Sequence, residues 1–252
     1  MVEIFILSLV QGITEFLPIS SSSHLILISK YIRFENQGMS VDISLHIGSF
    51  LAVITYFRKD IINFIKNKNL FYKIFISSIP VMLAGFFLVK YNLIEKIRNI
   101  QVIGWATIIF GILLFVSDKM SLNKKLEKNF SYSSAIVIGI LQIASLIPGV
   151  SRSGISITAA RFLQFDRYDS AKISFLLSIP TLAAVSLYGI SNLINSDSLS
   201  FSILNLIAIF LSFIFSYVTI KFFLQYIQKF SLNIFVIYRL VVGIILLAIY
   251  YL

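Results

Sequence analysis

The sequence has 252 residues, of which 58% are hydrophobic and 13% charged, and its mean hydropathy is +0.92. Because soluble globular domains are far less apolar, the composition predicts an integral membrane protein and excludes a soluble enzyme or binding module. The net charge of +10 comes from Lys and Arg in short loops between apolar stretches, a pattern typical of membrane topology rather than of nucleic-acid binding. The chain contains no cysteine, so neither disulfides nor thiolate chemistry contributes.

The first apolar stretch, residues 2–32, is interrupted by the run Q-G-I-T-E-F-L-P-I-S-S-S-S-H from Gln11 to His24. An ionisable group at bilayer depth costs ~2.5–3.5 kcal/mol, so the run predicts a buried polar site. Pro18 breaks the helix, and irregular backbone at this depth is tolerated only where protein or water surrounds it. We therefore expect a re-entrant pair of half-helices that does not cross the membrane, the second beginning near Ser22.

Uninterrupted apolar stretches that approach the ~20 residues needed to cross a bilayer follow along the rest of the chain. They cover residues 43–57, 70–89, 100–116, 173–194, 201–220 and 231–252. Between the third and the fourth lies a second interrupted stretch, 135–164, in which Pro148 opens the run P-G-V-S-R-S-G. It predicts a second re-entrant pair.

The two halves of the chain resemble each other. L-P-I-S-S-S-S in the first half parallels I-P-G-V-S-R-S in the second, which places Ser21 beside Ser151 and Ser22 beside Arg152. Farther on, K-I-F-I-S-S-I-P-V-M-L-A-G-F parallels K-I-S-F-L-L-S-I-P-T-L-A-A-V. Each half holds one re-entrant pair and three spans, and because three is odd the second half is inverted relative to the first. Inverted repeats with broken helices bring two half-helix ends into one site, so the Gln11–His24 and Pro148–Gly154 runs are expected to face each other.

The predicted fold is therefore all-α: a polytopic membrane protein with six transmembrane helices plus two re-entrant half-helix pairs in two inverted repeats. One membrane domain covers residues 1–252, with the repeats at about 1–120 and 131–252.

The topology also predicts an orientation. It places most basic residues on one side of the membrane, for example Arg58 and Lys59, and fewer on the other, for example Arg33, Lys90 and Arg98. Basic loops favour the cytoplasm, so both termini and the entrance of the first re-entrant pair are expected to face outward.

The residue types in the two runs fit a phosphate site. Small hydroxyl residues cap helix starts, whose free N–H groups bind anions, and the planar fork of Arg152 suits phosphate oxygens. Glu15 and His24 add a metal ligand or base and a proton shuttle. The residues expected to contact the phosphates are Gln11, Ser20, Ser22, Gly149, Ser151, Ser153 and Gly154.

Simpler structural roles remain for several of the polar residues. The hydroxyls of Ser20 and Ser23 could hydrogen-bond to carbonyls within a kinked helix. His46 is interpreted as a structural, hydrogen-bonded group because it lies mid-span in S-L-H-I-G-S with no acidic neighbour. Arg239, also at membrane depth, could either reach the site or pair with a backbone carbonyl.

At these residues the chain resembles the bacterial undecaprenyl-diphosphate phosphatase family, the integral-membrane lipid phosphatases associated with bacitracin resistance. The first family motif, [E/Q]-x-x-x-E followed by F-L-P-x-S-S-x-x-H, is matched from Gln11 to His24, and the second, P-G-x-S-R-S-G, from Pro148 to Gly154. The similarity extends nearly end to end, through D-I-S-L-H-I-G-S and the terminal I-Y-R-L-V-V-G. The chain departs from the family's usual residues at two positions: Ser23 replaces a glycine, and Gln11 replaces a frequent glutamate.

The resemblance implies removal of one phosphate from undecaprenyl diphosphate, which recycles the carrier lipid for peptidoglycan and other envelope polymers and confers bacitracin resistance. By analogy Glu15, Ser21, His24 and Arg152 are the catalytic residues, assisted by a divalent cation, Mg2+ or Ca2+, with Glu15 as its ligand. Gln11 is expected to hydrogen-bond phosphate or water rather than to bind the metal. The enzyme would lie in the bacterial inner membrane with its site toward the outer face; its partner is the polyprenyl diphosphate lipid, with no nucleic acid, and a homodimer is an open alternative.

Two other interpretations compete with this one. A secondary transporter or lipid flippase for an anionic substrate shares inverted repeats with broken helices, but it needs no proton-transfer groups beside Arg152. The acid-phosphatase-like lipid phosphatases require a histidine after the S-R pair, and no histidine follows Arg152.

Overall fold

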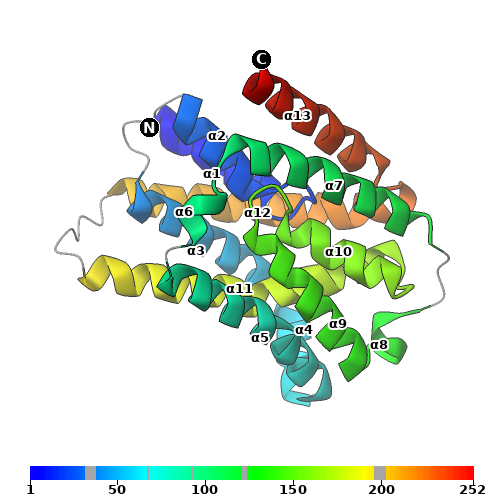
Figure 1. Cartoon of the computed structure of the whole chain (residues 1–252). Helices are drawn as coiled ribbons and strands as arrows, with labels where there is room; N and C mark the ends of the chain where they lie inside the picture. The colour runs from blue at the N-terminus through cyan, green and yellow to red at the C-terminus, as the bar shows by residue number, and fades with distance from the viewer. Residues whose placement is uncertain (32–37, 67, 92, 121–123, 196–202) are drawn as a thin grey trace.

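The computed structural model describes residues 1–31, 38–66, 68–91, 93–120, 124–195 and 203–252. Arg33, one of the basic residues assigned to the outer side, lies outside these ranges. Within them the regular elements are helices, apart from a single bridge between Lys124 and Phe165. The all-helical prediction is confirmed (Figure 1).

Six helices of the described residues are long and apolar enough to span a membrane, as predicted. They are α3 (Met39–Tyr56), α5 (Lys68–Lys90), α7 (Ile100–Asp118), α11 (Arg167–Asn195), α12 (Ile203–Lys229) and α13 (Asn233–Tyr251). The largest boundary differences concern α11, which starts six residues before the predicted 173, and α12, which continues nine residues past 220. α11 starts early because Asp166 Oδ1 accepts a hydrogen bond from the Asp169 amide at 2.7 Å, which satisfies a free N–H of the first turn.

Shorter helices occupy the two interrupted stretches. In the first are α1 (Val2–Thr14) and α2 (Ser21–Tyr31); in the second are α9 (Tyr132–Gln142), the 3-10 turn η1 (Ile143–Leu146) and α10 (Arg152–Phe162). The breaks fall at Pro18 and Pro148, where the sequence predicts them. The remaining short helices are α4 (Arg58–Lys66), α6 (Ile94–Ile97) and α8 (Leu126–Asn129).

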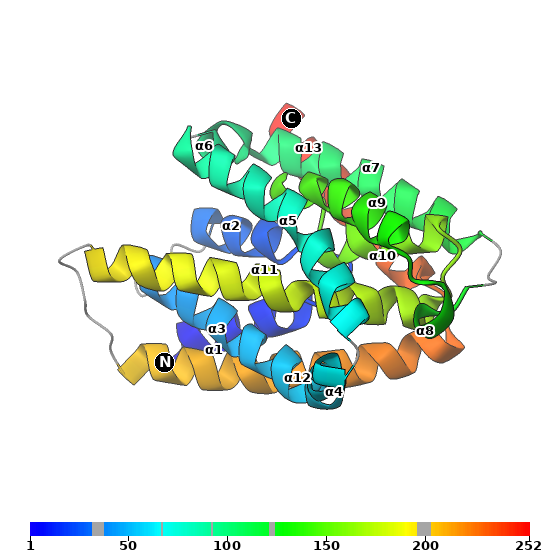
Figure 2. The same ribbon diagram turned by 90° about the horizontal axis from the view of Figure 1, so that it is seen from below.

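Close helix contacts are made through small residues, the usual solution in membrane proteins. α12 packs against both α1 and α3, and α3 lies between α11 and α12 (Figure 2). A β-carbon at Gly48 of α3 would lie 2.4 Å from the Ile209 carbonyl oxygen, and one at Gly12 of α1 would lie 2.5 Å from a side chain of α12. Ser49 and Ser216 hydrogen-bond across the α3–α12 contact at 3.0 Å.

A network around Asp118 ties four helices together at the end of the molecule where α8 lies. Arg167 of α11 donates to both Asp118 oxygens, at 2.7 and 3.0 Å, and the Leu232 amide before α13 donates to Oδ2 at 3.1 Å. Arg161 of α10, fully buried, donates to the Asp118 carbonyl oxygen at 2.8 Å. This network fixes the end of α10 opposite to Arg152.

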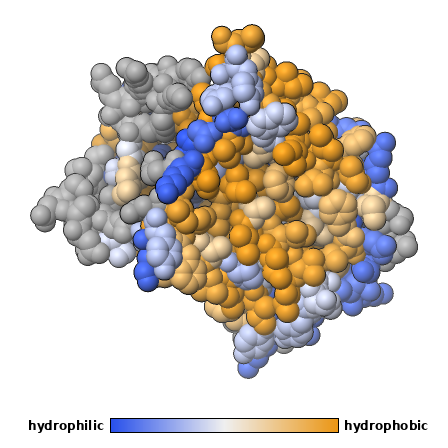
Figure 3. Space-filling view, viewed as in Figure 1, coloured by the Kyte–Doolittle hydropathy of each residue, from blue (hydrophilic) through white to orange (hydrophobic). Residues whose placement is uncertain are grey.

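The surface agrees with a membrane location. In Figure 3 a broad apolar area lies between two hydrophilic margins. Large exposed hydrophobic side chains, among them Phe86, Phe210 and Phe222, point outward from the long helices. A surface of this kind matches a lipid environment.

Candidate functional site

The two interrupted stretches meet at one place inside the bundle. Arg152 Nη2, at the first residue of α10, donates to Glu15 Oε1 at 2.6 Å. Ser153 Oγ donates to the carbonyl oxygen of Leu17 at 2.7 Å. The sequence expectation that the Gln11–His24 and Pro148–Gly154 runs face each other therefore agrees with the geometry.

Glu15 is the centre of this site. It is 7% exposed, and its second oxygen, Oε2, accepts hydrogen bonds from Ser21 Oγ at 2.7 Å and from Gln11 Nε2 at 3.1 Å. With Arg152 on Oε1, the carboxylate joins three of the predicted site residues. A serine hydroxyl bonded to a buried carboxylate beside a guanidinium is an arrangement suited to proton abstraction next to bound phosphate.

Both helices that start at the site are preceded by a serine in the left-handed region, Ser20 with φ 73° and Ser151 with φ 71°. This conformation is uncommon for residues other than glycine and is often found at functional sites. The Ser151 hydroxyl caps α10 by accepting from the Gly154 amide at 3.1 Å, and the Ser20 hydroxyl bonds to that of Ser23 at 3.0 Å. The backbone thus pairs Ser20 with Ser151, one residue away from the sequence-based pairing of Ser21 with Ser151, because the second loop has one more residue after its proline. α2 begins at Ser21, which agrees with the predicted start near Ser22.

Gly149 must be glycine for two reasons. Its φ is +100°, and a β-carbon there would lie 2.6 Å from the carbonyl oxygen of Ile103 in α7. The second loop can therefore approach α7 only without a side chain at this position.

His24 does not contact the predicted catalytic partners. Its Nδ1 lies 2.6 Å from the Ser20 carbonyl oxygen and its Nε2 lies 2.6 Å from the Tyr238 hydroxyl. A carbonyl oxygen only accepts, so Nδ1 carries the proton, and in the neutral ring Tyr238 donates to Nε2. The two rings also stack, with centroids 5.9 Å apart. Both ring nitrogens are thus occupied away from Glu15 and Ser21.

Tyr238 is a site neighbour that the sequence analysis missed. It belongs to α13, far along the chain from His24, and no local spacing rule connects the two residues. The available signal was its position beside Arg239 within I-Y-R-L-V-V-G.

His46 lies closer to the site than expected. Gln11 Nε2 is 3.2 Å from His46 Nδ1, so the ring accepts a hydrogen bond from the amide that also donates to Glu15. The statement that His46 has no acidic neighbour was wrong, because Asp42 lies four residues earlier on α3. The i, i+4 spacing of Asp42 and His46 was the signal that could have revealed this.

Arg239 fulfils both alternatives left open by the sequence. It reaches the site region from α13, and it does so by donating to backbone carbonyls in both loops.

The donor set for a divalent cation is small. Within the described ranges no three His, Asp or Glu side chains gather as a metal site. However, Gln11 Oε1 is buried and has no partner among these residues, and Glu15 lies one turn away on the same helix face. Mg2+ commonly takes one or two protein oxygens and completes its shell with substrate phosphates and water. Glu15 and Gln11 Oε1 fit a cation held in that way, which differs from the expectation that Gln11 would hydrogen-bond phosphate or water rather than bind the metal.

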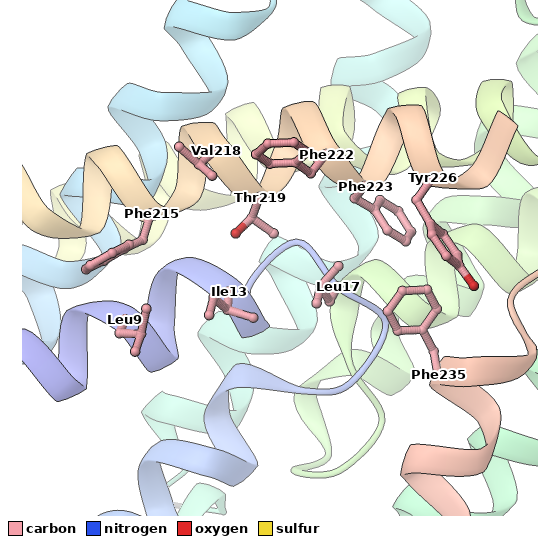
Figure 4. Close-up of a pocket in the computed structure, with 10 residues that line it drawn as sticks. All are labelled: Leu9, Ile13, Leu17, Phe215, Val218, Thr219, Phe222, Phe223, Tyr226 and Phe235. Carbon is pink, nitrogen blue, oxygen red and sulfur yellow. The ribbon is translucent and has the colours of Figure 1, made fainter. Parts of the chain in front are cut away.

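An apolar groove lies next to the first loop. Its cavity of about 410 Å³ is bounded by the end of α1, by α12 and by the start of α13 (Figure 4). The lining residues are Leu9, Ile13, Leu17, Phe215, Val218, Thr219, Phe222, Phe223, Tyr226 and Phe235. Leu17 also provides the carbonyl that binds Ser153, so the groove and the polar site share one loop.

Comparison with known proteins gives consistent matches. A family model described as "Bacitracin resistance protein BacA" matches residues 4–245. A protein of Pelagibacter ubique named undecaprenyl-diphosphatase is 48% identical over 251 residues, covering 99% of this chain and 98% of its own. Proteins of the same name from Jannaschia sp. and Saccharophagus degradans are 38% and 40% identical, and each alignment covers more than nine-tenths of both chains.

Proposed function

The chain belongs to the bacitracin resistance protein BacA family, and from this premise we propose that it hydrolyses undecaprenyl diphosphate to undecaprenyl phosphate and inorganic phosphate. The observation that carries the proposal is the hydrogen-bonded group of Glu15, Ser21 and Arg152 between two helix N-termini. The reaction consumes one water and breaks one P–O bond of the bridging P–O–P linkage. Its product would return to the pool of carrier lipid for envelope polymers, which would also account for bacitracin resistance.

In this mechanism the two helix starts and Arg152 bind the phosphates. The N–H groups at the starts of α2 and α10 and the guanidinium stabilise the charge that develops on the phosphoryl oxygens. Glu15 takes the proton either from Ser21 Oγ, which donates to it at 2.7 Å, or from a water that donates a hydrogen bond to it. A covalent Ser21 nucleophile and an activated water both remain compatible with this geometry. His24 is proposed to act as a proton shuttle that does not contact Glu15. Its Nε2 must leave Tyr238 before it can transfer a proton.

We also propose two finer features of the fold, the re-entrant helix pairs and the inverted repeats. α1 and α2 have 13 and 11 residues, too short to cross a bilayer that needs ~20, so we assign them, and α9 with α10, as re-entrant pairs. The matching left-handed serines support the two inverted repeats. So do Pro80 and Pro180, which lie inside α5 and α11 at equivalent places.

The prenyl chain would lie between the helices, toward lipid. The apolar groove beside Leu17 (Figure 4) offers part of that chain a surface made of aliphatic and aromatic side chains. Burial of the apolar surface of the prenyl chain would hold it in the groove. The groove's cavity has a size that is common for ligand sites.

The decisive test is phosphate release. Purified protein in detergent should liberate inorganic phosphate from a C55 or C15 diphosphate, and the Arg152→Ala protein should not. A transporter or flippase would bind the diphosphate without releasing phosphate, so binding with no release in the unaltered protein would refute the proposed reaction.

A divalent cation, Mg2+ or Ca2+, is proposed to assist by neutralising phosphate charge next to Glu15. We expect Gln11→Glu to lower the cation concentration needed for half-maximal activity by about tenfold, the scale on which neighbouring groups change metal affinity. The added carboxylate would replace the unpartnered amide oxygen one turn from Glu15. Cation titrations of the activity measure this, with Gln228→Glu, an exposed position on α12, as the matched control. An unchanged titration in Gln11→Glu would exclude the residue from the cation site.

The site is proposed to open to the outer face of the inner membrane. Ser22 is exposed, so Ser22→Cys in this cysteine-free chain should react with an impermeant thiol reagent added to intact cells. Ser153, in the first turn of α10, is buried and therefore unsuitable for this labelling. Lys59→Cys, exposed and assigned to the cytoplasm, is the control that should react only after permeabilisation. If Lys59→Cys reacts in intact cells and Ser22→Cys reacts only after permeabilisation, the site opens to the cytoplasm and the proposed orientation is wrong.

A further inference from the structure

The guanidinium of Arg239 holds both interrupted stretches at once. Arg239 is 1% exposed. Its Nη1 donates to the Pro18 carbonyl oxygen at 3.0 Å and to that of Val150 at 2.9 Å, so one nitrogen bridges the loop before α2 and the loop before α10. Nη2 donates to the Gly149 carbonyl oxygen at 2.9 Å, and Nε donates to that of Thr107 in α7 at 3.2 Å.

We propose that Arg239 is a positioning residue that fixes the two loops relative to each other, and thereby fixes Ser21 and Glu15 relative to Arg152. This inference rests on the proposed hydrolysis, but the structural part of it can be judged without activity. Arg239 touches none of the residues expected to react; it acts through the backbone that carries them.

The first argument is the choice of partners. A buried cation is costly, and the usual compensation is a carboxylate. The four groups to which Arg239 donates hydrogen bonds are backbone carbonyl oxygens instead. Three of them, in Pro18, Gly149 and Val150, belong to segments outside the α-helices, where carbonyls lack the regular partners of helical backbone. Arg239 therefore supplies the donor to the loop carbonyls of Pro18 and Val150, and it adds a second donor to that of Gly149, which Thr107 Oγ1 also reaches at 3.5 Å.

The second argument is the space left for this side chain. A β-carbon at Gly154 would lie 3.0 Å from Arg239 Nη1, and one at Gly111 would lie 3.2 Å from Arg239 Cβ. Two neighbouring helices, α10 and α7, thus have glycine at the points where they face the arginine. The sequence is adapted to this side chain at this place.

The third argument is geometric. Arginine presents five N–H donors in a rigid plane, whereas lysine presents three donors from one nitrogen on a flexible stem. A single ammonium cannot reach carbonyls in three separate segments with the same directions. If the role is positioning, lysine should fail although it keeps the charge.

The experiment compares purified Arg239→Lys with the unaltered protein by hydrogen exchange and by kinetics. We expect faster exchange in peptides covering residues 15–20 and 147–151, with α3 and α12 unchanged, and a kcat for a C15 diphosphate lowered by about 10²-fold, the cost of a small misplacement of reacting groups. Arg161→Lys is the matched control: Arg161 is also buried and also donates to carbonyls, but at the far end of α10. It should leave loop exchange and kcat unchanged.

Gly111→Ala is a second variant in case the Arg239→Lys protein does not fold. Its added methyl group would displace Arg239 without removing a hydrogen-bond donor, so it should also speed hydrogen exchange in the two loops and lower kcat. Unaltered loop exchange and kcat in Arg239→Lys would overturn the proposal by showing that charge alone suffices. Faster exchange throughout the protein would overturn it by showing a general structural role. If the unaltered protein releases no phosphate, the proposed reaction fails, whereas the exchange comparison still decides whether Arg239 holds the loops.

Discussion

Glu15→Gln is expected to reduce kcat for phosphate release by about 10²- to 10⁴-fold, the usual contribution of a general base. Glu15 is the carboxylate that accepts from Ser21 and Arg152 at once. The amide has nearly the same shape, but it cannot take a proton from Ser21 or from a water in its place. It would also weaken the charge-assisted hydrogen bond to Arg152.

The measurement is steady-state phosphate release by purified protein, and thermal unfolding checks that the variant is folded. Glu127→Gln, an identical change at an exposed position of α8, is the control and should keep full activity. A Glu15→Gln protein that retains most of its turnover would show that another group accepts the proton, and His24, once released from Tyr238, would then be the next residue to test.

Arg152→Lys is expected to lower kcat by about 10²- to 10³-fold, the loss seen when one preorganised donor to a transition-state oxyanion is removed. Arg152 begins α10 and holds Glu15 through Nη2 at 2.6 Å, which leaves its other N–H groups for phosphate. Lysine keeps the charge but cannot bind two oxygens in a plane. Arg152→Ala should lose at least as much.

Arg167→Lys is the matched control for this substitution, because Arg167 binds both oxygens of Asp118 far from the site. It should reduce stability without changing kcat. Activity of Arg152→Lys close to that of the unaltered protein would show that the planar fork is not required and that charge alone acts on the phosphates.

Features governed by local sequence were predictable. The six spans follow from apolar length. The breaks follow from Pro18 and Pro148 together with the polar runs around them, since proline removes a helical hydrogen bond but Pro80 and Pro180 alone do not end α5 and α11. The meeting of the runs that contain Glu15 and Arg152 was expected because inverted repeats with broken helices bring two half-helix ends into one site.

Features that depend on distant partners were not predictable. His24 binds Tyr238, 214 positions away, and Gln11 binds His46 from another helix; only the packing of α2 against α13 and of α1 against α3 brings these pairs together. The left-handed backbone of Ser20 and Ser151 was missed for a related reason. Serine rarely adopts this conformation by preference, so it is imposed by the surrounding structure.

Arg239 also has a consequence for the order in which the protein is made. Gly149 and Arg239 are 90 positions apart, and at ~5–20 residues per second the ribosome needs about 5 to 18 s to add that length. During this interval both loops have been synthesised, but the side chain that joins them does not yet exist. The site can therefore be completed only when α13 inserts beside α7. A chain that stops before α13 carries every proposed catalytic residue without the contact that holds them together.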